Sequence, residues 1–395
     1  MSNLQYEIVI AGGGPGGLMA ALALKKQGFS SLVVEGASRE KICADIGGSY
    51  HIGSPTLSIL EHLGVAEQCR SAGTRFSALK VFANNGSVIM KMPLPQNIDM
   101  MTLRRSSLQT SLLSLLEQSQ MQCGVSVSSF EEKEEKILVK LSTGDEIETK
   151  LLIGADGVNS KVRQVLLNDG SPRFCDLTCC WGRVKLDQLK NLKDFTTSDA
   201  ITQLGLGASI AIATIKDEVI WSAFWRTTSF QRSEDPIKRK SQVMEKFSTW
   251  ASPTPEIIMA TPSEIIAEVG IWDRDPCKNW YKGRVVLIGD AVHPMTPFLG
   301  QGANSAMIDA FVLAHYLGHQ PYTDAFKSYE QRRKPITDRN IKTAREISDY
   351  TTTDKRWKHF LSTSFLRFMP KSIILHTMLK ADQLNDISDI LTTTK

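Results

Sequence analysis

The fold is decided by residues 6–35, which read YEIVIAGGGPGGLMAALALKKQGFSSLVVE. The apolar run from Tyr6 to Ala11 predicts a short buried strand, and Leu18 to Gln27 predict a helix of mostly small side chains that ends at Gly28. A second apolar strand follows from Ser31 to Glu35. A strand, a helix and a strand in this order are typical of a β-α-β unit, so we expect an α/β fold that begins with parallel strands.

The turn between the first strand and the helix reads GGGPGG, from Gly12 to Gly17, and satisfies the pattern G-x-G-x-x-G. In this pattern Gly12 permits the tight turn, Gly14 lets a pyrophosphate approach the backbone, and Gly17 allows close packing of helix on strand. The phosphates then lie at the helix N-terminus, where free N–H groups and the helix dipole favour anions. The pattern, completed by Pro15 and Gly16, predicts a dinucleotide site.

Glu35 ends the second strand 23 residues after Gly12. A carboxylate at this place can accept hydrogen bonds from a ribose diol and disfavours a 2′-phosphate. The site therefore suits FAD or NAD.

The composition is that of an ordinary globular protein of 395 residues, with 42% hydrophobic and 22% charged residues. The net charge of +4 is small and the basic residues form no dominating cluster, so nucleic acid is not an expected partner. The seven cysteines show neither C-x-x-C pairs nor interleaved histidines, and we expect free thiols and no metal site. Residues 1–5, with polar Ser2, Asn3 and Gln5, lead directly into the first strand, so we expect no signal peptide, and no stretch suits a membrane-spanning helix. We expect a cytoplasmic protein.

Two further segments favour FAD over NAD. Residues 151–163 read LLIGADGVNSKVR, and residues 283–304 read GRVVLIGDAVHPMTPFLGQGAN. With the glycine turn, they resemble the three motifs of the FAD-dependent aromatic hydroxylases, the group A flavoprotein monooxygenases. This family includes para-hydroxybenzoate, salicylate, urate and quinolone-type hydroxylases. The order and spacing of the motifs are similar to the family's.

The resemblance implies roles for individual residues of the cofactor site. Asp290 binds the ribityl hydroxyls of the flavin, and backbone N–H groups at Gly300 and Gly302 lie against the isoalloxazine and stabilise negative charge on the reduced ring. Pro297 shapes the floor beside the flavin, and Asn304 belongs to the same binding segment.

Other positions are implied less directly. Asp156 supports the pyrophosphate loop, Arg105 reaches the pyrophosphate with its guanidinium fork, and Arg104 is the competing assignment. Val127 corresponds to the position whose backbone contacts the adenine, although a plain core valine is the alternative. His293 has the appearance of a general acid, but the family pattern makes it structural.

The resemblance also implies the architecture: a Rossmann-like FAD-binding domain with an inserted mixed or antiparallel substrate-binding sheet and C-terminal helices. We expect the FAD-binding domain at 1–173, with an excursion into the substrate domain near 75–102, and again at 271–340. The substrate-binding sheet is expected at 174–270 and the C-terminal helices at 341–395.

The implied function is that of a monooxygenase that hydroxylates an aromatic or polycyclic small molecule with NAD(P)H and O₂ through a flavin C4a-hydroperoxide. The first alternative is an FAD-dependent reductase of the same fold that acts on a prenyl or quinone-like substrate. A flavin-binding protein without turnover is the second. The choice between NADH and NADPH, and between a monomer and a homodimer, stays open.

The substrate pocket is predicted on two strands, Ser209 to Thr214 and Val219 to Arg226. Family members that hydroxylate urate are similar to this chain in this region, but they carry an arginine and a tyrosine on the two strands. Matched by eye, this chain has Ser209 and Trp221 at those positions. Alternation places Trp221, Ala223 and Trp225 on one face, and Ser222, Phe224 and Arg226 on the other. The pocket candidates are Ser209, Trp221, Phe224, Arg226 and Pro297. A pocket without a central cation favours a neutral, fairly large aromatic substrate; the alternative is that these aromatics are sheet core and loops form the pocket.

The segment 355–380 contains six Lys or Arg residues and no acid, interleaved with apolar side chains. Such a segment can make peripheral contact with an anionic membrane. The alternative is a set of helices packed on the FAD-binding domain with a solvated basic face.

Overall fold

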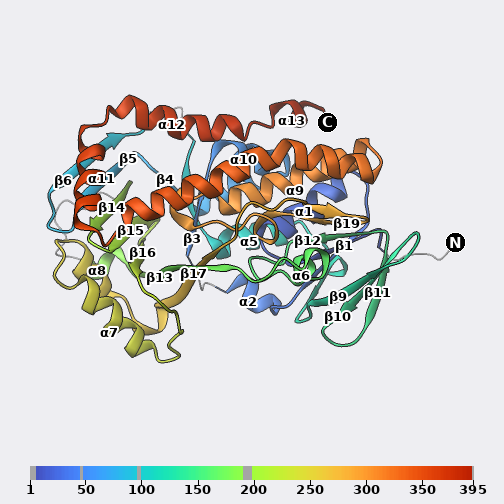
Figure 1. The fold of residues 1–395 in the computed structure, drawn as a ribbon, viewed down its shortest axis with the longest axis horizontal. Coiled ribbons are helices and arrows are strands. Elements are labelled where there is room, and N and C mark those ends of the chain that lie inside the picture. Colours follow the sequence, from blue (N-terminus) through green and yellow to red (C-terminus); the bar gives the residue numbers. More distant parts are fainter. Residues whose placement is uncertain (1–5, 45–47, 96–98, 190–197, 394–395) are drawn as a thin grey trace.

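The computed structural model describes residues 6–44, 48–95, 99–189 and 198–393, apart from the side chains of 377–379, 381–383 and 393 (Figure 1). Residues 1–5, on which the expectation about a signal peptide rests, lie outside the described residues. The predicted fold class is confirmed: a Rossmann-like α/β part and a second, mixed sheet lie side by side, with helices from the C-terminal part of the chain across both.

The Rossmann-like part is built on a six-stranded sheet in which all neighbours are parallel except the pair β18–β19. Its strands in spatial order are β18 (Tyr281–Lys282), β19 (Val285–Leu287), β12 (Leu151–Gly154), β1 (Ile8–Ala11), β2 (Ser31–Glu35) and β8 (Met121–Cys123). The three sequence motifs therefore lie on the adjacent strands β1, β12 and β19. Because parallel strands share an orientation, the turns that follow these strands meet at one edge of the sheet.

Two helices begin at this edge: α1 (Pro15–Lys26) and α9 (Gly302–His319). Both are rich in small buried residues, which lets them pack closely on each other and on the sheet. The close approach is visible at Gly16, where a Cβ atom would stand 3.1 Å from the Cβ of Ala306. The N-termini of the two helices are thus neighbours.

The second part is a seven-stranded sheet whose neighbours are antiparallel except for the pair β14–β5. Its strands in spatial order are β17 (Ala267–Asp273), β13 (Arg173–Lys185), β16 (Glu218–Arg226), β15 (Ala208–Ile215), β14 (Asp199–Gly205), β5 (Ala78–Ala83) and β6 (Val88–Pro93). Strands from two distant ranges, 78–93 and 173–273, therefore form one sheet. One face is covered by α7 (Pro236–Phe247) and α8 (Thr254–Ala260), which bury a separate hydrophobic core.

Two small sheets and the remaining short helices complete the fold. The sheets consist of β11 (Glu146–Thr149), β10 (Ile137–Leu141) and β9 (Val127–Glu132), and of β3 (Ser49–Ile52), β7 (Met101–Arg104) and β4 (Thr74–Arg75). The short helices are α2 (Arg39–Cys43), α3 (Ser54–His62), α4 (Ala66–Ala72), α5 (Arg105–Leu113) and α6 (Lys161–Leu167), with the 3-10 turns η1 (Gln118–Gln120), η2 (Leu186–Leu189), η3 (Ser263–Ile265), η4 (Gly289–Ala291) and η5 (Pro297–Leu299).

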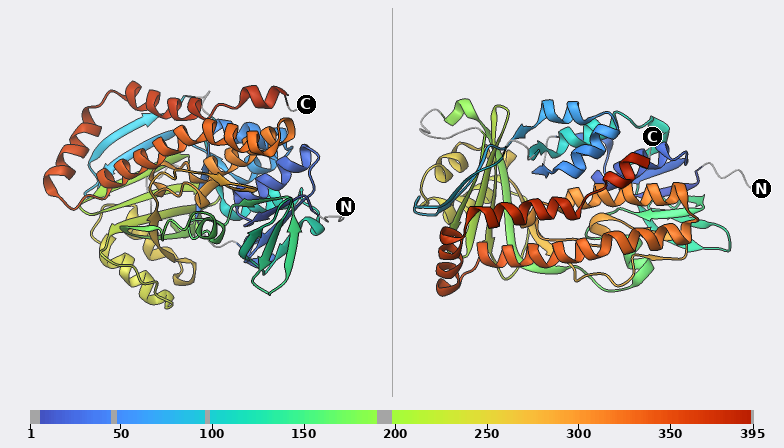
Figure 2. Two further views of the ribbon diagram at one scale, coloured as in Figure 1. Left: turned by 45° about the vertical axis from the view of Figure 1, so that its right-hand side comes forward. Right: turned by 90° about the horizontal axis from the view of Figure 1, so that it is seen from above.

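The C-terminal helices span the length of the molecule (Figure 2). The long helix α10 (Tyr322–Thr351) runs from the six-stranded sheet to the far end of the seven-stranded sheet, where α11 (Arg356–Phe368) turns away. Then α12 (Lys371–Leu384) and α13 (Ser388–Thr393) return along α10. Arg332 of α10 holds α13 through two contacts of 2.7 Å to Asp389. Among the described residues, no helix is long and apolar enough to cross a membrane.

Candidate functional site

The glycine turn between β1 and α1 has the geometry that its sequence predicts. Gly12 has a φ of +105°, and a Cβ atom there would collide with the carbonyl oxygen of Ala155. A Cβ at Gly17 would collide with the carbonyl oxygen of Gly12. Gly14, by contrast, has no atom within 4 Å of its Cβ position, and as N-cap of α1 it makes no side-chain capping bond. The first N–H groups of α1 are therefore open to an anion.

Glu35 lies beside this turn at the end of β2. Its carboxylate accepts a 2.5 Å hydrogen bond from the backbone N–H of Gly13 and one of 2.7 Å from that of Ala37. Each oxygen keeps a lone pair for a further donor. The side chain is thus fixed at the edge of the glycine turn.

The N-terminus of α9 opens beside that of α1. Its N-cap, Gln301, makes no side-chain capping bond, and Gly300 before it adopts a left-handed φ of +66°. A Cβ atom on Gly302 would stand 3.9 Å from Oδ1 of Asp290, so this carboxylate faces the start of the helix. Two neighbouring helix N-termini without side-chain caps form a strong electropositive crevice.

Asp290, Tyr50 and Arg105 surround the crevice. The carboxylate of Asp290 is accessible to solvent, yet the protein encloses it closely enough for desolvation to raise its pKa. Burial also raises the pKa of Tyr50, and both Arg105 and Asp290 act electrostatically on its hydroxyl. Arg105 and Asp290 are thus each within electrostatic range of the Tyr50 hydroxyl. Tyr50 was missed in the sequence because it belongs to none of the three motifs.

The structure distinguishes the two arginines at the start of α5. Arg104 forms an ion pair of 2.5 Å with Glu218 on β16, so its guanidinium points toward the seven-stranded sheet. Arg105 is exposed, and its Nε donates to Gln109 on the same helix at 3.1 Å. Its electrostatic effect on Tyr50 places it on the crevice side. This geometry favours Arg105 over Arg104 as the cofactor residue.

Asp156 and Val127 lie at the borders of the crevice. Oδ2 of Asp156 accepts from the backbone N–H groups of Lys161 and Val162 at 2.7 and 3.1 Å, which caps α6, while the buried Oδ1 has no partner among the described residues. Burial raises the pKa of this carboxyl. Val127 is buried at the start of β9, a few residues after β8.

The side chain of Asn304 is hydrogen-bonded to the protein backbone. Its Nδ2 donates to the carbonyls of His51 at 2.7 Å and Gly300 at 3.0 Å, and its Oδ1 accepts from the N–H of Gly53 at 3.2 Å. The side chain therefore ties β3 to the Gly300 turn. His51 itself is exposed beside Gly300, shares a 3.0 Å hydrogen bond between its Nδ1 and Oγ1 of Thr102, and has a pKa lowered by desolvation.

His293 is structural, in agreement with the sequence pattern. Its Nε2 is hydrogen-bonded to Oδ2 of Asp309, whose Oδ1 accepts from Nε of Arg333 at 2.7 Å, and all three side chains are buried. Oδ2 also accepts from the N–H of Gly289 at 3.1 Å. Burial opposes ionisation of Asp309, but His293 and Arg333 hold its pKa below the usual range. This cluster fixes the turn that carries Asp290.

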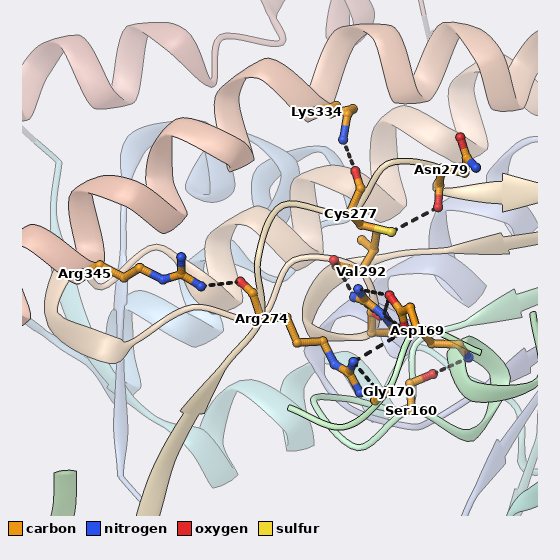
Figure 3. Close-up of polar contacts among 11 residues, drawn as sticks. Ser160, Asp169, Gly170, Arg274, Cys277, Asn279, Val292, Lys334 and Arg345 are labelled. Carbon is orange, nitrogen blue, oxygen red and sulfur yellow. Dashed lines mark hydrogen bonds and ion pairs between the residues drawn. The ribbon is translucent and has the colours of Figure 1, made fainter. Parts of the chain in front are cut away.

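Arg163, at the end of the second motif, connects that motif to the third. Its buried guanidinium donates to the carbonyl of Val292 at 2.8 Å and contacts Asp169 at 2.6 Å. Arg274 lies on the other side of Asp169 and donates to the carbonyl of Gly170 at 2.9 Å (Figure 3). These contacts stabilise the segments that carry Asp156 and Asp290. Several of the partners are far apart in the sequence, so no local pattern reveals them.

The faces of the seven-stranded sheet require a correction. Trp221 does not line a pocket: it is fully buried against α7 and α8, and its Nε1 donates to Oγ1 of Thr261 at 2.9 Å. The predicted alternation is right, but helices cover the face of Trp221, Ala223 and Trp225, so this pocket prediction is wrong. Ser209 and Phe224 are directly opposite each other on β15 and β16 and belong to the other face.

This second face approaches the cofactor crevice. The ring of Phe224 lies 4.6 Å from the ring of Phe298 in η5, the turn that begins with Pro297. At the centre of the face, Ala211 is exposed and Thr202 and Ser222 are half-buried. Register places these three small residues side by side on β14, β15 and β16. They form an accessible surface, here called the central surface.

Among the described residues, three cations near this face, Arg226, Arg104 and Arg183, are paired with carboxylates. Arg226 donates from Nη2 to Asp349 at 2.7 Å and from Nε to the carbonyl of Thr352 at 3.2 Å. At the opposite end of the strands, Arg104 and Arg183 both contact Glu218, at 2.5 and 3.5 Å, beside a hollow of about 210 Å³. The central surface between them carries no charge.

An electropositive crevice at a glycine turn, beside a second sheet with an uncharged accessible surface, defines a dinucleotide-binding oxidoreductase with a separate substrate side. The comparisons with known proteins identify the family. Residues 5–344 match the family described as the FAD binding domain, and the chain belongs to it.

Relatives of known activity are monooxygenases. The chain is 32% identical to an aurachin C monooxygenase/isomerase of Stigmatella aurantiaca over 78% of this chain and 80% of the relative. It is 30% identical to a 3-amino-4-hydroxybenzoate 2-monooxygenase of Streptomyces platensis over 85% and 86%. The predicted class is thereby confirmed: the protein is an FAD-dependent monooxygenase with NAD(P)H as co-substrate, and the reductase alternative finds no support in these relatives.

Solved structures share the fold over almost the whole chain. HpxO of Klebsiella pneumoniae, in a complex with FAD and uric acid, superposes with a TM-score of 0.87 at 24% identity and covers 97% of this chain and 99% of its own. A salicylate hydroxylase substrate complex superposes with a TM-score of 0.77 at 20% identity, with 98% and 99% covered.

Proposed function

We propose that this monooxygenase binds FAD in the crevice at the N-termini of α1 and α9 and hydroxylates a neutral aromatic or polycyclic molecule on the central surface. The observation that carries the proposal is the juxtaposition of two helix N-termini without side-chain caps with the enclosed carboxylate of Asp290. This combination offers backbone N–H donors for anionic groups and an acceptor for hydroxyl groups.

The residues fit FAD in a definite order. Gly14 and the first turn of α1, with Arg105, hold the pyrophosphate; Glu35 accepts from the adenosine ribose, and Val127 borders the adenine. Asp290 accepts from the ribityl chain, while Gly300 and Gly302 present backbone to the ring system beside Pro297. Bound there, FAD supplies the transfer of electrons from NAD(P)H to O₂.

The remaining residues position these groups. Asp156 caps α6, Asn304 fixes the Gly300 turn to β3, and the buried charges of Asp309 and Arg333 fix the turn at Gly289. Electrostatic effects in such a site depend on dipoles that are already oriented. The protein's part is therefore to hold the donors in place and to keep the site dry.

The expected substrate follows from the sheet face. Its accessible centre is formed by Ala211, Thr202 and Ser222, and Arg226 and Arg104 at its two ends are paired with carboxylates. A carboxylate substrate would lose hydration without gaining an unpaired cation. A large, neutral ring gains apolar contacts and leaves no charge unsatisfied.

The test compares substrate-stimulated NAD(P)H oxidation for salicylate, para-hydroxybenzoate and urate with that for an alkyl-quinolone and a polyketide phenol. We expect coupled oxidation with the larger neutral rings, with ¹⁸O from ¹⁸O₂ in the product. Tight coupling to a small acid and none to the neutral rings would overturn the substrate proposal. This test does not address two further predictions: the contact of residues 355–380 with a membrane, and the choice between a monomer and a homodimer.

A further inference from the structure

Helix α11 is amphipathic, but its apolar side chains are exposed to solvent instead of buried. At about 100° per residue, Trp357, Phe360, Leu361, Phe365 and Phe368 fall within an arc of about 140°. Each of these side chains is more than half exposed, with Phe368 at 81%, and none of the residues of α11 is buried. A surface helix of a globular protein normally turns its apolar stripe inward. This outward stripe is here called the aromatic face.

The side of α11 opposite the aromatic face is half-buried and carries Ser362, Thr363 and Leu366. Oγ of Ser362 donates to the carbonyl of His359 at 3.0 Å and that of Tyr350 at 3.4 Å, and Oγ1 of Thr363 donates to His359 at 2.8 Å. Lys358 lies over the Tyr350 ring at 5.2 Å. The contacts of Ser362 and Lys358 with Tyr350 join α11 to the end of α10, and the large exposed fractions of the aromatic face show that it points away from the protein.

Basic side chains flank the aromatic face. Arg356 and Arg367 are exposed and lie along one edge of the arc, and Lys355 and Lys371 are exposed at the two ends of the helix. No Asp or Glu occurs between residues 355 and 380. An apolar stripe with cations at its edges is complementary to a surface of apolar chains under anionic headgroups.

The helix also stands at an extremity of the molecule. It lies beside β6, at the end of α10 farthest from the six-stranded sheet (Figures 1 and 2). Its 13 residues span about 20 Å, too short to cross a bilayer but sufficient to lie along its surface. The aromatic face is therefore exposed at one end of the molecule, next to the β5–β6 hairpin.

We propose that the aromatic face of α11 docks the enzyme on an anionic membrane, with α11 in the interfacial plane. A second copy of the chain is a poorer occupant, because a two-fold interface would place the same face against itself and bring the basic side chains of both copies together without an acid between them. Anionic lipid neutralises these charges and covers the aromatic side chains in one step. This proposal is independent of the substrate.

The experiment is co-sedimentation of the FAD-loaded enzyme with vesicles of phosphatidylcholine mixed with phosphatidylglycerol, and with vesicles of phosphatidylcholine alone. We expect binding to the anionic vesicles at low salt, weaker binding at high salt, and much weaker binding to the neutral vesicles. The variant Phe365→Ser/Phe368→Ser should bind at least tenfold more weakly, and Arg356→Gln/Arg367→Gln about fivefold more weakly for each arginine removed.

The matched control is Ile237→Ser/Met259→Ser on α7 and α8, where the two side chains are 68% and 63% exposed. This variant should bind vesicles like the unaltered enzyme, and all variants should keep the flavin spectrum and melting temperature. Absence of vesicle binding by the unaltered enzyme, or equal weakening in the control, overturns the proposal. So does a dimer in sedimentation velocity that Phe365→Ser/Phe368→Ser dissociates while vesicle binding stays the same.

Discussion

At the scale of single residues, the proposed cofactor site contains accessible groups that could contact FAD and buried groups that hold the surrounding backbone in place. Asp290 is accessible and faces Gly302, whereas Asp309 is buried and bonded to His293 and Arg333. Asp290 lies within the third motif and Asp309 shortly after it. Burial opposes ionisation of both carboxyls, but interaction with His293 and Arg333 lowers the pKa of Asp309, whereas desolvation raises that of Asp290. The two side chains should therefore fail in different ways when they are changed.

Asp290→Ala should lose flavin and keep the fold. Several hydrogen bonds to ribityl hydroxyls disappear together, at a cost of about 1–3 kcal/mol, which corresponds to a roughly 10- to 100-fold weaker affinity. Flavin fluorescence titration measures the dissociation constant, and the melting temperature of the apoprotein serves as the control. An affinity equal to that of the unaltered enzyme would remove Asp290 from the site.

Asp309→Asn should instead destabilise the whole protein, because it leaves Arg333 buried without a counter-ion, at a cost of about 3–5 kcal/mol. The matched control is Asp389→Asn. Asp389 is 63% exposed and pairs with Arg332, the neighbour of Arg333 on α10, and this exposed ion pair contributes less than about 1 kcal/mol to stability. Denaturant unfolding monitored by circular dichroism distinguishes the two.

The same carboxylate predicts the response to acid. The pKa of Asp309 in the folded state lies below the ordinary value of 3.8, so its contribution to stability is complete above that value and is lost as the pH falls through the folded-state pKa. The free energy of unfolding should decline below about pH 4, and less steeply in Asp309→Asn. Equal slopes for both proteins would contradict this assignment.

At the scale of elements, the sequence predicts the strands and helices that depend on neighbouring residues, but not the packing between segments that are distant in the chain. The β-α-β unit is local, and the periods of β1, α1 and β2 predict it within a few residues. The strands β15 and β16 are also predicted nearly to their ends. Alternation separates the two faces of β16 but does not say which one helices cover, because this depends on α7 and α8 at residues 236–260. Trp221 was assigned to the wrong side for this reason, and Tyr50 and Arg163 act through partners far away in the chain.

The corrected face gives a prediction on β15. Ala211→Phe should place a ring on the central surface and raise KM for the substrate by about tenfold, equivalent to about 1.4 kcal/mol of lost binding, while flavin affinity stays the same. Leu206→Phe, at a 46% exposed position of the turn before the same strand, is the control. Steady-state kinetics with an alkyl-quinolone measures the effect. Unchanged kinetics in Ala211→Phe would show that the substrate lies elsewhere.

At the scale of the whole molecule, α10 connects the cofactor side to the substrate side. Arg333, in the first half of α10, contacts buried Asp309 of α9. Further along, Nε of Arg345 contacts buried Asp273 on β17 at 2.6 Å, and its Nη2 donates to the carbonyl of Arg274 at 2.8 Å (Figure 3). Near its end, Asp349 pairs with Arg226 on β16. One helix thus contacts both the Rossmann-like part and the seven-stranded sheet, and it pairs with the cation at one end of the face that carries the central surface.

If the proposed substrate surface is right, we expect the contact between Asp349 of α10 and Arg226 to influence the charge preference for the substrate. Asp349→Asn should release Arg226, whose side chain lies on the face that carries Ser209 and Phe224. Because Asp349 is 57% exposed, the ion pair is worth at most about 1 kcal/mol, so kcat/KM for an aromatic acid should gain up to about fivefold relative to a neutral ring. Asp275→Asn is the control, since Asp275 pairs with Arg345 and does not contact Arg226. The ratio of kcat/KM for salicylate to that for a neutral phenol is the measurement, and a ratio that stays equal in all three proteins would show that Arg226 does not reach the substrate.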